Sequence, residues 1–158
     1  MKNKTKLSLW ERYLTKEIGI EFKSCLYFFA DLFFYCMFRI ITGRFDASIL
    51  HMAELIFARY LLCYVQVFLL WNFDEAEELG GKEIIGMTLC TVGYTCLGAA
   101  LGWFEGNLWV NIGFGAYVLF TYVMMFFVNR TKRRIDDKKL NKDLMLFQAR
   151  INLEDEDD

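Results

Sequence analysis

Long apolar runs alternate with short polar segments along this chain of 158 residues. A helix needs roughly 20 apolar residues to cross a hydrocarbon core about 30 Å thick. Four runs approach that length, at residues 24–41, 49–71, 84–104 and 109–128. Because only short polar segments join them, runs that are consecutive in sequence should be antiparallel neighbours in space. The pattern predicts an all-α fold, with an integral membrane four-helix bundle over residues 24–128.

The N-terminal segment, residues 1–23, has a different period. Its apolar residues recur at helical spacing, at Leu7, Trp10, Leu14, Ile18 and Phe22, and its polar residues Glu11, Arg12, Thr15 and Lys16 fall on the other face. This pattern predicts an amphipathic helix that lies along the inner membrane surface and then turns into the first span. The helix would serve as an anchor, or alternatively as a sensor of lipids or amphiphiles.

The C-terminal segment, residues 129–158, begins with a basic collar, "NRTKRR". An apolar seam follows at spacings of four, three and four, formed by Leu140, Leu144, Phe147 and Ile151 (the C-terminal seam). Since no Pro or Gly follows Gly115, the fourth span should continue into this cytoplasmic helix. A seam of two heptads is too short to be stable alone, so it needs the N-terminal helix, a second copy or another protein. The final "LEDEDD" should be a disordered acidic tail.

Composition and charge support a membrane protein. Apolar residues make up 56% of the chain, aromatic residues make up 18%, and proline is absent, unlike in ordinary soluble domains. Lys and Arg gather in the two tails, whereas the first outer loop has only Arg44 and the last loop has neither. This asymmetry predicts that both termini are cytoplasmic. A cleaved signal peptide is not expected, because the first apolar run starts late and is too long. The charge pattern gives no reason to expect direct nucleic acid binding.

Four ionisable residues lie inside the first two spans: Asp31, Arg39, Glu54 and Arg59. An unpaired charge at the bilayer centre costs about 2.5–3.5 kcal/mol or more, so each should have a partner. In an antiparallel hairpin, residues at equal depth have a nearly constant sum of positions. Depth therefore pairs Asp31 with Arg59 and Arg39 with Glu54.

Three roles are possible for these charged residues. The first is a clamp that fixes the register of the two spans, which is the best-attested use of buried polar groups. The second is a polar site for a ligand or a proton, and the third is a metal site of His51, Glu54 and another ligand. One His is far short of a closed metal set, so no metal is expected. His51 either bonds Glu54 or faces water, and Gln66, seven residues beyond Arg59, extends the polar network. Five cysteines, all inside apolar runs, should be reduced and serve packing.

Small residues mark the third span as a packing element. Gly86, Gly93 and Ala100 recur every seven positions, and Gly98 and Gly102 form a G-x-x-x-G motif. Small residues let helix backbones approach closely in lipid. They should serve packing within the bundle, or alternatively the self-association of two copies into a homo-oligomer.

The layout and the final "LNKDLMLFQ" (residues 140–148) resemble a bacterial four-span membrane family catalogued as domain of unknown function 3021. Members are often encoded beside LytTR-type DNA-binding regulators, and some restrain that regulator at the membrane. The resemblance implies a multi-pass protein of the bacterial cell membrane and a cytoplasmic regulator as its partner. No catalytic residues are known for the family, so the resemblance assigns none here.

Two classes of function compete. The first is a non-enzymatic signalling or regulatory partner, which binds a cytoplasmic protein from the lipid bilayer. The second is a small transporter or an accessory subunit of a transport complex, with intramembrane charges lining a path. An enzyme is not expected and no cofactor is implied, because the sequence shows no nucleophile–base pair, metal set or phosphate loop. The broken helices typical of transport sites are also not evident.

Overall fold

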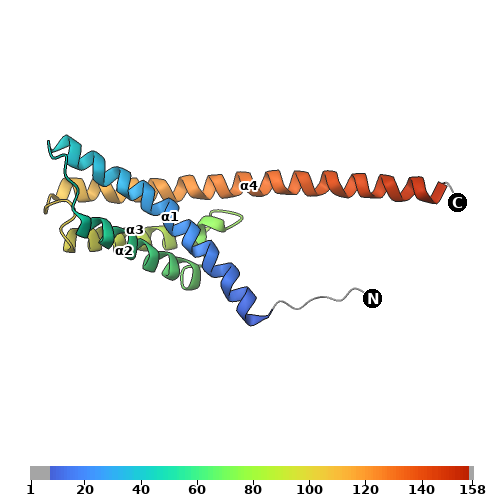
Figure 1. Cartoon of the computed structure of the whole chain (residues 1–158), viewed down its shortest axis with the longest axis horizontal. Helices are drawn as coiled ribbons and strands as arrows, with labels where there is room; N and C mark the ends of the chain where they lie inside the picture. Colours follow the sequence, from blue (N-terminus) through green and yellow to red (C-terminus); the bar gives the residue numbers. More distant parts are fainter. Residues whose placement is uncertain (1–7, 157–158) are drawn as a thin grey trace.

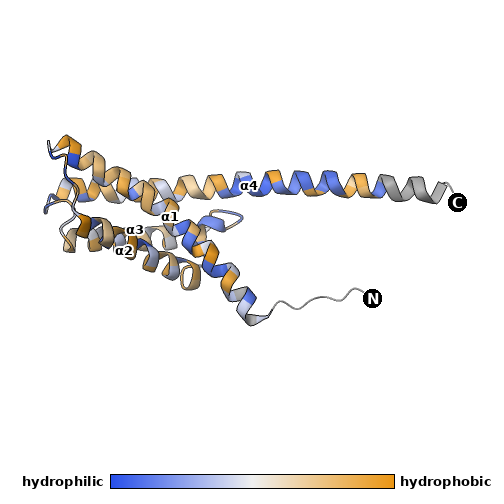
Figure 2. Cartoon of the chain, viewed as in Figure 1, coloured by the Kyte–Doolittle hydropathy of each residue, from blue (hydrophilic) through white to orange (hydrophobic). Residues whose placement is uncertain are grey.

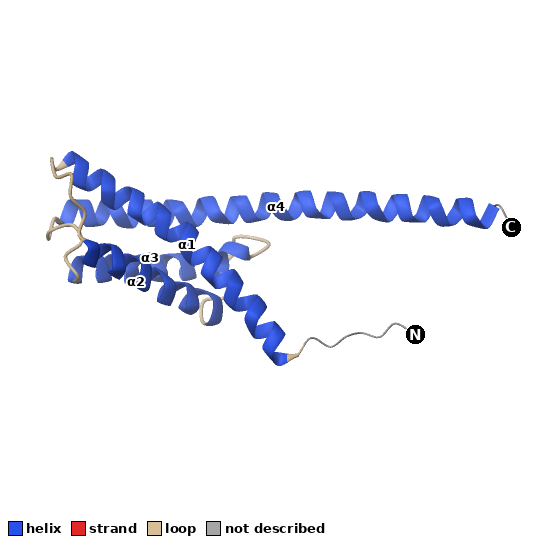
Figure 3. Cartoon of the chain, viewed as in Figure 1, coloured by secondary structure: helices blue, strands red, loops and turns tan. Residues whose placement is uncertain are grey.

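The computed structural model describes the backbone of residues 8–156 and the side chains of residues 8–148 except 9 and 12. This part of the chain is helical and contains no strand (Figures 1 and 3). Its elements in chain order are α1 (Leu9–Ile41), α2 (Ile49–Phe68), the short 3₁₀ helix η1 (Phe73–Glu75), α3 (Gly81–Ala100) and α4 (Leu108–Glu156). The all-α prediction is confirmed.

Each of the four α-helices contains a stretch long and apolar enough to cross a membrane. These stretches are Tyr13–Ile41, Ile49–Phe68, Gly81–Ala100 and Leu108–Gln148. Large apolar side chains cover the outside of the bundle, among them Phe29, Phe33, Phe57 and Phe120, each at least 60% exposed. Such a surface is stable in lipid and unstable in water. The chain is a multi-pass membrane protein, and its apolar residues concentrate in the bundle (Figure 2).

One uninterrupted helix, α1, contains both the N-terminal segment and the first span. It begins at a capping box, in which the Ser8 hydroxyl accepts from the Glu11 backbone N–H at 3.3 Å and the Ser8 N–H donates to the Glu11 carboxylate at 2.7 Å. Its 33 residues give a length of about 50 Å. The predicted turn between an amphipathic helix and the first span is therefore not present. Nothing between residues 9 and 41 breaks helical geometry, since Gly19 is tolerated there.

Consecutive helices pack as two hairpins, α1 with α2 and α3 with α4. Both the second and the third spans end earlier than expected, at Phe68 and Ala100. After α2 the backbone turns through left-handed conformations at Trp71 and Asn72. After α3 it turns at Gly102, whose φ of 72° favours glycine, and the next residues fold back into the core.

The core is aromatic and lies where the four helices meet. Trp103, Phe104 and Phe114 are all at most 1% exposed. The Phe104 and Phe114 rings lie 5.0 Å apart, and Trp103 meets Tyr94 edge to face at 5.3 Å. Aromatic pairs at such distances add about 0.5–1.5 kcal/mol beyond the area they bury. This cluster fixes the loop between α3 and α4 to the bundle.

The fourth helix, α4, extends far beyond the bundle, as predicted from the lack of a helix breaker. Its 49 residues span about 74 Å, more than twice the hydrocarbon thickness. Figure 1 shows this extension continuing alone, with the start of α1 on the same side of the bundle and the N-terminal half of α1 diverging from the extension. The helix continues through Glu156, so most of the tail expected to be disordered is helical.

Candidate functional site

A buried ion pair lies at the centre of the bundle and joins α1 to α2. Arg59 donates from Nε to Asp31 Oδ2 at 2.7 Å and from Nη2 to Oδ1 at 2.8 Å. Both side chains are at most 1% exposed. The structure thus brings together the pair expected from equal depth.

Three tyrosines complete the surroundings of Arg59. Its Nη1 donates to the Tyr122 hydroxyl at 2.8 Å. Its guanidinium carbon lies 4.1 Å from the centre of the Tyr94 ring, 5.1 Å from Tyr27 and 5.5 Å from Tyr122. A desolvated cation–π contact is worth about 2 kcal/mol or more. The Arg59 charge on α2 is therefore held by groups from the other three α-helices, which fits a clamp that fixes the bundle's register.

A second buried charge cluster lies at the end of the bundle from which the α4 extension projects. Lys23 Nζ donates to Asp74 Oδ1 at 2.8 Å and also contacts the side chains of Asn72 and Glu75. The Tyr27 hydroxyl donates to Asp74 Oδ2 at 2.7 Å. Because Tyr27 also faces Arg59, it lies between the two clusters. A chain of polar and aromatic contacts thus runs from the middle of the bundle to this end.

The α2–α3 connection, residues 69–80, is rich in acidic side chains but is folded, and we call it the plug. Within it, Phe73 and Asp74 are fully buried and η1 packs against α3 and α4. Asn129 of α4 donates to the Asp74 carbonyl at 3.0 Å, and Arg133 donates to the Glu75 carbonyl at 2.6 Å. The plug therefore joins the buried charges to the base of the α4 extension.

Sequence reasoning missed the plug because a run of charges usually lies in solvent. Two signals could have revealed it. Phe73 stands alone as an aromatic residue inside the acidic segment, and a large apolar side chain in such a place often anchors a loop. The second signal is Lys23, which directly precedes the first apolar run, and in the structure this side chain is buried in the bundle.

The predicted pair of Arg39 and Glu54 does not form. Arg39 instead binds Glu105 at 2.9 Å and Asp46 at 3.1 Å, and Arg44 also contacts Glu105. Glu54 accepts from Trp103 Nε1 at 3.0 Å. Equal depth is not sufficient to predict a pair, because successive residues of a helix point in directions about 100° apart. Glu54 is five residues before Arg59 and so points about 140° away from it around α2.

His51 and Gln66 also differ from expectation. His51 does not bond Glu54; its Nδ1 lies 3.2 Å from the Tyr35 hydroxyl. Gln66 is fully buried on the same side of α2 as Arg59, as its spacing implied. Its side-chain amide has no hydrogen-bond partner among the described protein groups, so it does not extend the ion-pair network.

Only two of the four predicted packing glycines make close approaches. An added Cβ would lie 2.9 Å from the Phe73 ring at Gly86 and 2.7 Å from the Trp103 ring at Gly98. Gly93 has open space around it, and Gly102 lies in the turn after α3. The G-x-x-x-G motif is therefore not a helix-packing face here. A close approach that sequence reasoning missed is Gly115, which faces Thr95 on α3.

The C-terminal seam is uncovered within this chain. Leu140, Leu144 and Phe147 are 67%, 53% and 62% exposed, whereas the side chain of Ile151 lies outside the described residues. The N-terminal part of α1 does not cover it, since Trp10 and Leu14 are themselves exposed and α1 points elsewhere (Figure 1). The intramolecular alternative is therefore wrong for the described residues.

Among the described residues, no group of three or more His, Cys, Asp or Glu side chains is placed to hold a metal ion. All five cysteines are free, with Cys63 and Cys90 buried and Cys25 and Cys96 exposed on the helix surfaces. Comparisons of the chain with protein-family models, with curated proteins and with solved structures found no match.

Proposed function

We propose that this protein is a non-enzymatic regulatory partner at the membrane, which binds a cytoplasmic protein along the α4 extension. The observation that carries the proposal is the continuity of one face of α4. In the bundle this face is formed by Val118, Tyr122 and Phe126, all buried against the other helices. Beyond the bundle, Asn129 and Arg133 on the same face contact the plug. The face then continues, at the same spacing of three or four residues, as the C-terminal seam.

The packing face of α4 extends beyond the helices that bury it, so its exposed part needs another partner. Burial of a large apolar side chain contributes about 1.5–3 kcal/mol. Full burial of the three described seam residues would therefore contribute at most about 4.5–9 kcal/mol, part of which is unrealised because these side chains are more than half exposed. An amphipathic helix laid against the seam would recover this burial by the helix-in-groove mode. The membrane-embedded half of α4 keeps the extension helical, which removes the nucleation cost of a short isolated helix.

The distribution of Lys and Arg supports a cytoplasmic location for this surface. The collar before the extension contributes Arg130, Lys132, Arg133 and Arg134, while the opposite end of the bundle offers only Arg39 and Arg44. By the positive-inside rule the extension lies in the cytoplasm, and the resemblance to the four-span family implies a bacterial cell. The partner class implied by the resemblance, a LytTR-type regulator, would then be held close to the membrane.

The test compares two double variants of the full chain in native membranes. Leu144→Asp/Phe147→Asp places charges on the seam. Met145→Asp/Leu146→Asp is the matched control, because both residues are exposed on other faces of the same turns. The proposal expects a co-purified cytoplasmic protein with wild type and control, and its loss with the seam variant. Equal recovery with both variants, or with neither wild type nor control, would contradict the proposal.

The alternative is a small transporter or accessory subunit, and the buried charges are the feature that favours it. Both carboxylate oxygens of Asp31 are bound by Arg59, and Arg59 is enclosed by three rings. This arrangement supports a closed clamp better than a path for ions. Co-purification of a transport ATPase instead of a regulator would favour the alternative.

A further inference from the structure

A surface groove lies between α1 and α2, away from the plug and the seam. Its volume is about 360 Å³. The groove is lined by Glu21, Ser24 and Cys25 from α1 and by Ile56, Phe57 and Tyr60 from α2. Phe57 is 67% exposed and Ile56 is 43% exposed, within a membrane-spanning stretch. The walls are therefore accessible from the bilayer and are mostly apolar.

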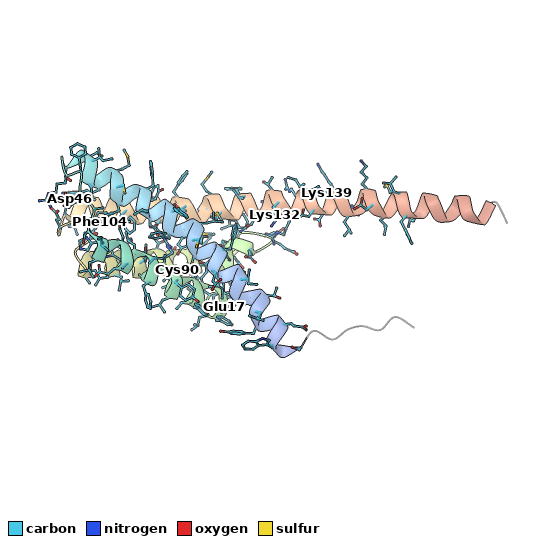
Figure 4. The ribbon with its side chains drawn as sticks, viewed as in Figure 1. Glu17, Asp46, Cys90, Phe104, Lys132 and Lys139 are labelled. Carbon is cyan, nitrogen blue, oxygen red and sulfur yellow. The ribbon has the colours of Figure 1, made fainter. Side chains whose placement is uncertain are left out.

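Two carboxyl groups, one helical turn apart on α1, lie at the Tyr60 end of the groove. Glu17 Oε1 accepts hydrogen bonds from Tyr60 at 2.7 Å and from Tyr64. Glu17 Oε2 is buried and has no hydrogen-bond partner among the described residues. Glu21 lines the groove itself, with its side chain exposed. Figure 4 shows Glu17 on the N-terminal half of α1.

Neighbouring lysines do not neutralise these carboxyl groups. Lys23 is buried on the other side of α1, where it binds Asp74. Lys16 Nζ lies 5.7 Å from the centre of the Phe68 ring, and neither Glu17 nor Glu21 is in an ion pair with any described side chain. A carboxylate at a low-dielectric surface is costly to leave without a cation. The end of the groove is thus complementary to a positive group.

The aromatic residues beside Glu17 fit the same chemistry. Tyr60, Tyr64 and Phe68 form a ladder along α2, with ring centres 5.1 and 5.9 Å apart. Lys16 already places one ammonium over this ladder, 5.7 Å from the centre of the Phe68 ring. Carboxylates together with aromatic faces bind ammonium groups, and here the Glu17 carboxylate is in contact with Tyr60 and Tyr64.

We infer that this groove binds an aminophospholipid of the bilayer, such as phosphatidylethanolamine. Its primary ammonium, which has three donors, is held by the carboxyl groups of Glu17 and Glu21. An acyl chain lies along Ile56 and Phe57. A phospholipid is favoured over a free amine because the groove opens to the bilayer and because the Lys16 ammonium, which lies over Phe68 in the same aromatic ladder, is available to a phosphate. This inference does not depend on the proposed regulatory function.

Cys25 supplies a built-in reporter, because it lines the groove and is exposed. The full chain carrying Cys36→Ser and Cys96→Ser is purified in a neutral detergent, and alkylation of Cys25 by a maleimide is followed by intact-protein mass. Lysophosphatidylethanolamine at about ten times its Kd should slow alkylation about tenfold. Lysophosphatidylcholine, which lacks the three donors, and lysophosphatidylglycerol should slow it less than about twofold.

Glu17→Gln/Glu21→Gln should abolish the protection, whereas Glu78→Gln, in the exposed part of the plug loop, should retain it. If the double variant does not fold, Glu21→Gln alone should weaken the protection, since that side chain is exposed. Equal protection by lysophosphatidylglycerol would show that any lipid covers the groove, and would overturn the inference. Protection by dodecylammonium but not by lysophosphatidylethanolamine would overturn the assignment to a phospholipid.

Discussion

Replacing one member of the Asp31–Arg59 pair should be far more costly than replacing both. We consider Asp31→Leu, Arg59→Met and the double variant, which exchange charges for apolar groups of similar shape. Asp31→Leu removes two charge-assisted hydrogen bonds, each worth about 1.5–3 kcal/mol, and leaves a buried guanidinium held only by three tyrosines. Losing one partner of a buried pair costs about 3–5 kcal/mol. We therefore expect a loss of about 4 kcal/mol in the free energy of unfolding.

Arg59→Met should cost less, although it also removes the contacts with the tyrosines. A stranded carboxylate neutralises itself by binding a proton, whereas a guanidinium remains charged. The expected loss is about 3 kcal/mol, at the lower end of the cost of breaking a buried pair. The double variant has no stranded charge, so it should recover a coupling energy of about 2–3 kcal/mol.

The assay is unfolding by sodium dodecyl sulfate in mixed micelles with a neutral detergent, followed by circular dichroism. Arg39→Met with Glu54→Leu is the matched control, because those residues are not paired, and their losses should add within about 0.5 kcal/mol. Additive losses at Asp31 and Arg59 would refute the clamp.

Three other predictions follow from the same structure. Asp74→Asn weakens the contacts with Lys23 and Tyr27 and should lower the free energy of unfolding by about 3 kcal/mol in the same assay. The control Glu77→Gln, exposed in the same loop, should change it by less than about 0.5 kcal/mol. Equal effects of the two substitutions would contradict a folded plug. Gly98→Ala would bring its Cβ against Trp103 and should lower the free energy of unfolding by about 1–3 kcal/mol. Gly93→Ala, where the added Cβ meets open space, should leave it unchanged or raise it. A Gly98→Ala variant as stable as the wild type would contradict close packing of Trp103 against α3. On a cysteine-free background, a cysteine replacing Asn107 should react with an impermeant maleimide in intact cells and one replacing Met145 should not; labelling at 145 would reverse the topology.

Periodicity and length were enough to predict the four helices, because a spanning helix is specified by its own apolar residues. The absence of Pro and Gly after Gly115 also correctly predicted the long α4. The same reasoning, applied to residues 9–41, would have predicted one continuous α1, because only Gly19 interrupts it. The turn that we expected there was based on a change in amphipathic pattern, which does not bend a helix.

The polar contacts were predictable only where depth and direction agreed. Asp31 and Arg59 satisfied both conditions, whereas Arg39 and Glu54 satisfied depth alone. The partners that Arg39 and Lys23 actually have, Glu105 and Asp74, lie in loops whose path depends on the packing of Phe104 and Phe73. Such contacts depend on tertiary packing between distant segments, which no local pattern contains.

The central claim is that the C-terminal seam contacts a cytoplasmic protein, and site-specific photocrosslinking tests it most directly. A benzophenone amino acid is placed at Phe147, on the seam, and separately at Leu146, which is equally exposed on another face, and native membranes are irradiated. The account predicts an adduct between this 18.7 kDa chain and a different protein from position 147 and none from position 146. An adduct only with a second copy of the chain, or the same yield from both positions, would contradict it.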